Sequence, residues 1–357
     1  MIIPKSEIAE KLSKLKIALS TNDSQTPPSM CGVLVKGNRL VASNLEMSIS
    51  TTFSIDSIES LNPNFILPAK AVDMIASLPN VDVEILATES QVGITAGKIK
   101  NKFAALTTED FQEPPEPKDD ADSFTIDGAR LNDMISSVLY AAAIGGERPI
   151  NTGVLFEAKD GYLNLVAVDG YRLAWNRSKF EGDFKFVVPR KALSALMKLG
   201  ITGDIEISAS KNNAIFRGTD YIFHTGLLAG NFFDYRAAYP AHSYSIEVDT
   251  KSLLDSIGRI MLCLDNVGNS PAIVTFDDGI LTLSLNSAFA QYSEDIAIEG
   301  EVDKSLRIGF NPKYLRDALK SCTGKKVGIS FGTESQPVVM ESEDLRPLVL
   351  PVRLNKS

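Results

Sequence analysis

Cysteine, histidine and tryptophan are scarce in this sequence of 357 residues, which contains three cysteines, two histidines and one tryptophan. Cys31, Cys263 and Cys322 lie far apart and form no CxxC pair. They are typical of the reduced thiols of a cytoplasmic protein. His224 and His242 have no cysteine or carboxylate nearby at the spacing of a zinc site. These absences predict no metal site and no cofactor.

Enzyme motifs are missing as well. The chain has no GxSxG, no P-loop and no GxGxxG. The pair Asp169-Gly170 could form a phosphate-binding turn, but the alternating residues around it fit a hairpin turn better. The acidic group Asp119, Asp120 and Asp122 is more typical of a solvated linker than of a magnesium site. We therefore predict that the chain is not an enzyme.

Long apolar runs are also absent. No stretch reaches the roughly 18 uninterrupted apolar residues of a membrane span, and the first five residues already include a lysine, unlike a signal peptide. The sequence therefore predicts a cytoplasmic location. Its 44% hydrophobic and 23% charged residues are typical of a globular protein. A chain of this length exceeds one compact core, so two or three domains are expected.

What the sequence does contain is one plan that recurs three times. Residues 5–19, 128–143 and 250–263 have the apolar periodicity of amphipathic helices, and their starts are separated by 123 and 122 residues. Asp127 and Asp249 occupy the N-cap positions of the second and third of these helices.

A second set of helices repeats at the same interval. Each follows an apolar strand and a proline, and Pro68, Pro189 and Pro312 are separated by 121 and 123 residues. Proline is tolerated at the first helical position, where its missing N–H would be unpaired anyway, so we place all three there. The six predicted helices are 5–20, 68–79, 128–144, 189–200, 250–263 and 312–326.

Strand pairs with a glycine-containing turn lie between the helices of each copy, at Gly37, Gly161 and Gly279. An acidic, proline-rich segment, 113–122, and a short break at 239–242 separate the copies. The prediction is an α+β protein of three repeated domains, 1–118, 124–240 and 241–357, each with two helices and antiparallel sheets. Three unrelated domains are the alternative.

Charge is segregated between the helices and the rest of the chain. The net charge is −9, which disfavours nucleic acid on average, but the six predicted helices together carry +10 and the remainder carries −19. If the helices share one surface, that surface attracts phosphates without reading bases. Solvated helix faces that are simply rich in lysine are the alternative interpretation.

Five segments match a known family in the right order: TGVLFE (152–157), AVDGYRLA (167–174), FVVPRKAL (186–193), FDYR (233–236) and LPVRL (350–354). With the threefold repeat, they make the whole chain resemble the bacterial DNA polymerase III beta subunit family, the sliding clamps. The resemblance implies a head-to-tail homodimer that closes a ring of six domains. Inner helices would line a hole for double-stranded DNA, outer sheets would form the rim, and the ring would serve DNA replication as a processivity factor.

The resemblance also implies a peptide-binding groove between the second and third domains. It would receive the short linear motifs of the replicative DNA polymerase, the clamp loader and repair proteins. Leu173, Val349 and Leu350 would form an apolar pocket. The matching residues are Asn151, Val168, Gly170, Tyr171, Arg172, Leu173, Phe233, Ala237, Ala238, Asn311, Tyr314, Leu348, Val349, Leu350, Pro351, Val352 and Arg353.

Some groove positions depart from the family pattern. The family usually has an apolar residue, Thr and His where this chain has Asn151, Val168 and Tyr171, and often a proline and a basic residue at Phe233 and Ala237. The chain also continues with residues 355–357 beyond the leucine at which many relatives stop. The rim of the groove is therefore expected to differ from the family's in polarity, and the three extra residues could cover part of it, which leaves open which partner motif fits best.

The remaining expected surfaces are those for DNA and for the second subunit. The expected DNA-facing residues are Lys14, Lys16, Lys70, Arg148, Arg190, Lys191, Lys198, Lys313 and Arg316. The expected dimer interface joins Phe103 and Leu106 of one subunit to Leu262 and Leu264 of the other. The alternative function is a protein-interaction scaffold of the same fold that docks peptides without tethering to DNA.

Overall fold

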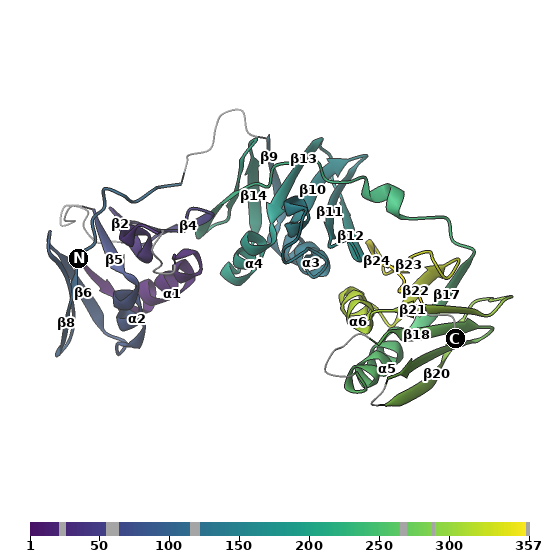
Figure 1. Ribbon diagram of the computed structural model, residues 1–357. Coiled ribbons are helices and arrows are strands. Elements are labelled where there is room, and N and C mark those ends of the chain that lie inside the picture. Colours follow the sequence, from purple (N-terminus) through teal and green to yellow (C-terminus); the bar gives the residue numbers. More distant parts are fainter. Residues whose placement is uncertain (21–25, 55–63, 115–121, 265–269, 288–289, 355–357) are drawn as a thin grey trace. The chain divides into compact units, whose positions relative to one another are not determined.

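Figure 1 shows the computed structural model of the chain, which describes residues 1–20, 26–54, 64–114, 122–264, 270–287 and 290–354. They form two compact units. Unit 1 consists of residues 1–132 and 191–227, and unit 2 of residues 133–190 and 228–357. No helix in the described part of the chain combines the length and the apolar character needed to cross a membrane.

The same order of elements occurs three times along the described residues, which is the repeat that the sequence predicts. The first copy consists of β1 (Ile2–Pro4), α1 (Lys5–Leu15), β2 (Gly32–Lys36), β3 (Arg39–Ser43), β4 (Met47–Thr52), β5 (Phe65–Pro68), α2 (Ala69–Ser77), β6 (Asp82–Ala87), β7 (Gln91–Ala96) and β8 (Ile99–Ala104). The second consists of β9 (Asp122–Asp127), α3 (Gly128–Leu139), β10 (Gly153–Lys159), β11 (Tyr162–Val168), β12 (Arg172–Lys179), β13 (Phe184–Pro189), α4 (Arg190–Leu199), β14 (Asp204–Ala209), β15 (Asn213–Arg217) and β16 (Tyr221–Gly226). The third consists of β17 (Tyr244–Asp249), α5 (Thr250–Leu262), β18 (Ala272–Asp277), β19 (Ile280–Asn286), β20 (Gln291–Glu299), β21 (Leu306–Phe310), α6 (Pro312–Ser321), β22 (Lys326–Phe331), β23 (Val338–Glu341) and β24 (Leu345–Val349).

Antiparallel pairing joins strands of neighbouring copies inside each unit. Unit 1 contains the four-stranded sheet β1-β6-β7-β8 and the eight-stranded sheet β5-β2-β3-β4-β16-β15-β14-β9. Unit 2 contains one twelve-stranded sheet, β13-β10-β11-β12-β24-β23-β22-β17-β20-β19-β18-β21. The first and second copies therefore meet at the pair β4 and β16, and the second and third copies meet at β12 and β24.

Local capping determines where the helices begin. The Asp249 side chain accepts a hydrogen bond from the Ser252 amide at 2.7 Å, and the Asp127 side chain accepts one from the Arg130 amide at 2.8 Å, as expected for N-caps. Pro312 is the first residue of α6, also as predicted. The prediction was wrong for Pro68 and Pro189, which end β5 and β13. Pro68 has ψ 149°, an extended value that places it before the helix rather than in it.

The last helix ends earlier than its periodicity predicts. Cys322 has ψ 136° and caps α6 after Ser321, so Lys325 lies beyond the helix and Lys326 begins β22. Lys16 likewise lies beyond α1, so three of the basic charges assigned to helices belong elsewhere, which lowers the helix total from +10 to +7. The helices remain basic relative to the rest of the chain.

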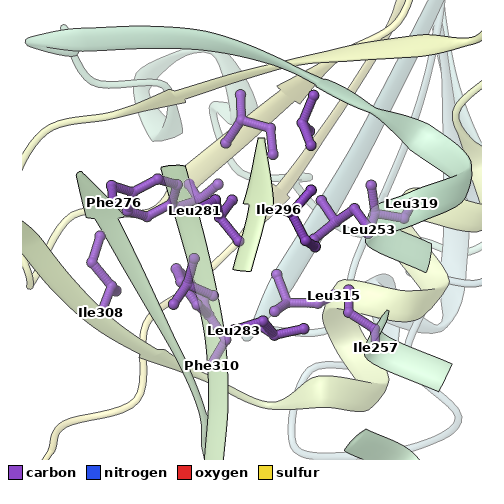
Figure 2. Packing of buried hydrophobic residues seen from close by; sticks show 14 of the residues in the cluster. Leu253, Ile257, Phe276, Leu281, Leu283, Ile296, Ile308, Phe310, Leu315 and Leu319 are labelled. Atoms are coloured by element: carbon purple, nitrogen blue, oxygen red, sulfur yellow. The ribbon is translucent and has the colours of Figure 1, made fainter. Parts of the chain in front are cut away.

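The helices of the third copy cover its core from one side. α5 and α6 lie side by side in unit 2 (Figure 1). Figure 2 shows Leu253 and Ile257 of α5 with Leu315 and Leu319 of α6 directed toward strand residues of the same cluster, which include Phe276, Leu281, Leu283, Ile308 and Phe310. The spacing of four residues places each helical pair on one face.

Candidate functional site

The pairing of β12 with β24 brings together two segments that the sequence analysis assigns to the peptide-binding groove. Leu173 lies opposite Leu348 and Arg172 lies opposite Val349. Beyond the strand end, the Leu350 amide donates to the Tyr171 carbonyl at 2.9 Å. Residues 168–173 and 348–350 are therefore neighbours, although more than 170 residues of chain separate them.

The Asp169 side chain shapes the turn that leads into β12. Its Oδ1 accepts hydrogen bonds from the amides of Tyr171 and Arg172, at 2.9 and 3.1 Å. Gly170 has φ 93°, a left-handed value that glycine adopts at little cost. The turn holds the Tyr171 side chain in solvent, where it is 62% exposed.

The Arg172 side chain, next to this tyrosine, contacts two carboxylates and two aromatic rings. Its Nε donates to Asp169 Oδ2 at 2.8 Å, and its Nη1 donates to Asp317 Oδ2 of α6 at 2.7 Å. Its guanidinium carbon lies 4.5 Å from the Tyr314 ring centroid and 5.3 Å from that of Tyr140. Such contacts fix the planar cation between aromatic rings.

Two tyrosine side chains next to Arg172 form an aromatic surface. The rings of Tyr171 and Tyr314 stack with centroids 6.0 Å apart and an interplanar angle of 23°. Leu350 and Val352 add exposed apolar side chains, 39% and 40% accessible. A surface of this kind suits a peptide with an apolar or aromatic anchor.

The apolar part of the predicted groove is more deeply buried than expected. Leu173 is 2% exposed and Val349 0%, so both are core residues rather than open pocket walls. Val349 belongs to the core of the third copy, whereas Leu173 belongs to a second cluster with Val168, Leu348 and the adjoining Phe233 and Ala238. The reason is that successive residues of β24 point to opposite faces of the sheet, and each face is covered.

The other predicted groove residues are distributed around this junction. Asn151 lies in a 3-10 turn, Pro149–Thr152, and its carbonyl accepts from the Ala143 amide at 2.9 Å. Ala237 is exposed in a second 3-10 turn, Tyr235–Ala238. Pro351 is half-buried and Arg353 exposed, while the Val352 amide between them donates to the Gly309 carbonyl at 2.7 Å.

Asn311, one of the predicted groove residues, caps α6 with its side chain. Its Oδ1 accepts from the Lys313 amide at 3.0 Å. Replacing Asn311 by alanine is expected to destabilise the first turn of α6 by about 1 kcal/mol, because that amide loses its partner. Faster hydrogen exchange of the α6 amides would show this. Asn311→Asp keeps the cap and should exchange like the parent, and equal protection in all three proteins would contradict the capping role.

A buried carboxylate that the sequence analysis did not single out anchors the Tyr235–Ala238 turn. Glu157 Oε2 accepts from the Tyr235 hydroxyl at 2.8 Å and from Arg236 Nη1 at 2.7 Å, and Lys185 Nζ lies 3.4 Å from Oε1. Burial alone would raise the pKa of Glu157, but the bonds from Arg236 and Tyr235 outweigh it and lower the pKa. The signal was present in the sequence, because TGVLFE ends on Glu157 and FDYR contains Tyr235 and Arg236.

The predicted DNA-facing lysines of unit 1 are mostly exposed. Lys16 pairs with Asp73, and Lys191 lies 4.0 Å from Glu46. The Lys14 ammonium donates to the Lys198 carbonyl at 3.3 Å. The side chains of Lys70 and Lys198 are exposed and form no ion pair with any other described residue.

The predicted DNA-facing residues of unit 2 divide into free and engaged cations. Arg148 and Lys313 are exposed and have no ion-pair partner among the described residues. Arg190 donates to the Ala142 carbonyl at 3.4 Å, and half-buried Arg316 lies 3.7 Å from Asp317. Arg148 and Lys313 are therefore the better candidates for phosphate contacts in this unit.

The four predicted dimer residues differ in their surroundings. Phe103 is half-buried in β8, the last strand of its sheet, and Leu262 at the end of α5 is 80% exposed. Leu106 instead packs on the buried cluster of Leu34, Val41 and Ile66, and Leu264 packs on the core of the third copy. Phe103 and Leu262 are the two that remain available for a partner.

Comparisons with known proteins agree along the whole chain. Models of the central and C-terminal domains of the DNA polymerase III beta subunit match residues 125–234 and 239–353. The beta sliding clamp of Streptococcus pneumoniae serotype 4 is 28% identical, with 99% of both chains covered, and that of Halalkalibacterium halodurans is 26% identical, with 92% of each covered.

Solved structures show the same fold. A DNA polymerase III beta subunit from Eubacterium rectale superposes with a TM-score of 0.92 at 23% identity, and a DNA polymerase sliding clamp from Pseudomonas aeruginosa with a TM-score of 0.91 at 23% identity. Each comparison covers 99% of both chains. The threefold order of elements, the family models and these relatives together identify the chain as a member of the DNA polymerase III beta subunit family, the bacterial sliding clamps.

Proposed function

We propose that the chain is a DNA polymerase processivity factor, a homodimeric ring that encircles double-stranded DNA, slides on it and docks replication proteins. Its membership in the clamp family supports this function. The family models also fall close to the second and third of the domains we propose, 1–118, 124–240 and 241–357. The relatives are named as clamps and not for a reaction, so we assign the chain no catalytic activity.

The observation that supports the ring is that two strands each have an edge with no pairing partner among the described strands. Inside the chain, the third strand after the first helix of a copy pairs with the last strand of the next copy, as β4 does with β16 and β12 with β24. The equivalent strands that have no such partner within the described chain are β20, the third strand after α5, and β8, the last strand of the first copy. Along 291–297, β20 pairs with β19 alone among the described strands, and β8 pairs with β7 alone. If β20 of one subunit pairs with β8 of the other, a closed head-to-tail dimer results.

The side chains of these two edges are complementary. Lys100 and Lys102 are exposed on one face of β8, and Asp295 is exposed on the free part of β20. Glu299 lies beyond this part, where β20 pairs with β17, and its carboxylate binds Lys326. Opposite charges across an antiparallel pair stabilise it. On the other face, Phe103 is half-buried and would be covered by the partner, near its α5.

The basic charge of the helices supports the proposal that the ring binds DNA. α4 carries Arg190, Lys191 and Lys198 and no acidic residue. Contacts of exposed lysine and arginine with phosphates are independent of sequence and weaken with salt, which permits sliding. We propose that docking uses the surface of Tyr171, Tyr314 and Leu350, with the replicative DNA polymerase and the clamp loader among its partners.

Retention on circular DNA tests the proposal. The purified protein, incubated with nicked circular DNA, should stay bound through high salt and dissociate once the DNA is linearised, because a ring is held by topology rather than by contacts. Light scattering on the purified protein without DNA should give twice the chain mass of 38.7 kDa. If binding is lost with salt equally from circles and linear DNA, the ring proposal fails, and the peptide-docking scaffold becomes the function that remains.

A further inference from the structure

The turn that leads into β4 has the same construction as the turn beside the proposed peptide site. Asn44 Oδ1 accepts from the amides of Glu46 and Met47 at 3.2 and 2.9 Å, as Asp169 does from Tyr171 and Arg172. The Glu46 carbonyl accepts from the Gly226 amide at 3.2 Å, which corresponds to the bond from Leu350 to Tyr171. Unit 1 thus contains, at the β4 and β16 pair, a counterpart of the β12 and β24 junction.

A cavity of about 130 Å³ lies at this counterpart. Its lining consists of Ser43, Leu45, Glu46, Met47, Ser48, Gln112, Glu113, Pro114, Asn213, His224, Thr225 and Gly226. An apolar cavity of about 150 Å³ is known to hold benzene, so this volume accepts one side chain of roughly the size of an aromatic ring.

Two polar side chains in the lining lack hydrogen-bond partners. Ser48 and His224 lie directly opposite each other on β4 and β16, and their side chains share one face of the sheet. His224 is 8% exposed and Ser48 3%, and neither His224 Nδ1 nor Ser48 Oγ has a partner in the described chain. Burial, with Arg39 and Arg217 nearby, lowers the pKa of His224 to about 4, so the ring is neutral at pH 7. Buried polar atoms without partners are costly, and a ligand with a hydroxyl would satisfy both.

Leu45 adds an unusual apolar element to the rim. It has φ 72° where the equivalent residue of the other turn is Gly170. A leucine in this conformation costs on the order of 1 kcal/mol, and at 55% exposure it gains little burial in return. Such strain points to use of the side chain in contact with something outside the chain.

The charges at the rim are balanced. Glu113 pairs with Lys36 at 2.7 Å, and Glu46 lies 4.0 Å from Lys191. The cavity therefore favours a neutral group over a cation or an anion.

We infer that this cavity is a second docking site, which takes a peptide segment by one tyrosine side chain, with the ring against Leu45 and the hydroxyl bonded to His224 Nδ1 and Ser48 Oγ. The choice of a peptide rests on the proposed function, because the site repeats the geometry of the proposed peptide site. The choice of a phenol rests only on the cavity and its two unpartnered atoms.

The full-length protein with labelled histidine tests the inference, because its two histidines give two ring signals. Titration with p-cresol and with N-acetyl-tyrosinamide should shift the His224 signal to saturation and leave that of His242 unchanged. Toluene, which lacks the hydroxyl, should bind at least fivefold more weakly, since Ser48 and His224 then stay unpaired.

Variants separate specific binding from loss of folding. Ser48→Ala should weaken p-cresol about fivefold through the lost hydrogen bond, and Leu45→Gly should weaken it severalfold while relieving backbone strain. Ser13→Ala, on an exposed face of α1, is the matched control and should bind like the parent. A His224 signal that never saturates, or equal affinity in all these proteins, would overturn the site. Loss of topological DNA retention with intact p-cresol binding would overturn the proposed function and leave the cavity site standing.

Discussion

Replacing Glu157 by alanine is expected to lower the free energy of unfolding of unit 2 by about 3 kcal/mol, because the loss of one partner of a buried charged network leaves the others unpaired. The Tyr235 hydroxyl, on a residue that is 1% exposed, would lose its acceptor, and Arg236 would lose its carboxylate. The chain offers a direct probe. Its single tryptophan, Trp175, has its ring centroid 5.2 Å from that of Tyr235, so tryptophan fluorescence during urea denaturation reports on this region.

The control variants separate charge from hydrogen bonding. Glu157→Gln keeps an acceptor for Tyr235 and should lose less stability than the alanine variant, whereas Glu181→Ala, an exposed position, should stay within about 0.5 kcal/mol of the parent. Glu157 has a lowered pKa in the folded state, so its stabilisation is complete above the ordinary value of 4.5 and is lost as the pH falls through the folded value. The parent should therefore lose more stability than Glu157→Gln below about pH 4.5. A common acid dependence in both proteins would contradict the network.

Replacing Arg172 by alanine should have a large effect on stability and on docking. Removal of the guanidinium leaves Asp169 and Asp317 without their shared cation, and we expect a loss of about 2–3 kcal/mol in unit 2. Burial disfavours the charged form of Arg172, but hydrogen bonds to Asp317 and Asp169 outweigh it and raise its pKa. Arg172→Lys keeps the charge but loses the two-pronged donor and the stacking on Tyr314, so an intermediate loss is expected.

Tyr171→Ala is the matched comparison for docking. Its ring is 62% exposed, so its removal should change the free energy of unfolding by less than about 0.5 kcal/mol. It should nevertheless weaken a clamp-binding peptide at least tenfold in titration calorimetry, because large exposed aromatic residues dominate such sites. Unchanged peptide affinity in Tyr171→Ala would place the docking surface elsewhere.

Sequence patterns were sufficient to predict those features of the structure that depend on residues close together in the chain. Ile8, Leu12 and Leu15 form the buried face of α1, as their helical spacing predicts. The caps at Asp127 and Asp249 were also predictable, because a capping side chain bonds to an amide three residues away. Pro68 and Pro189 show the limit, since proline fixes φ while ψ decides whether the residue ends the strand or begins the helix.

By itself, then, the sequence determined the threefold plan, the helices and their basic charge, because propensity, capping and amphipathic spacing act over a few residues. Only the tertiary structure decided which copies pair, since pairing depends on strand edges that lie far apart in the chain. That pairing buried Leu173 and Val349, gave Arg172 its partner Asp317 across 145 residues, and enclosed His224 opposite Ser48. Burial and charge pairing are properties of the packed molecule, so no local pattern could have supplied them.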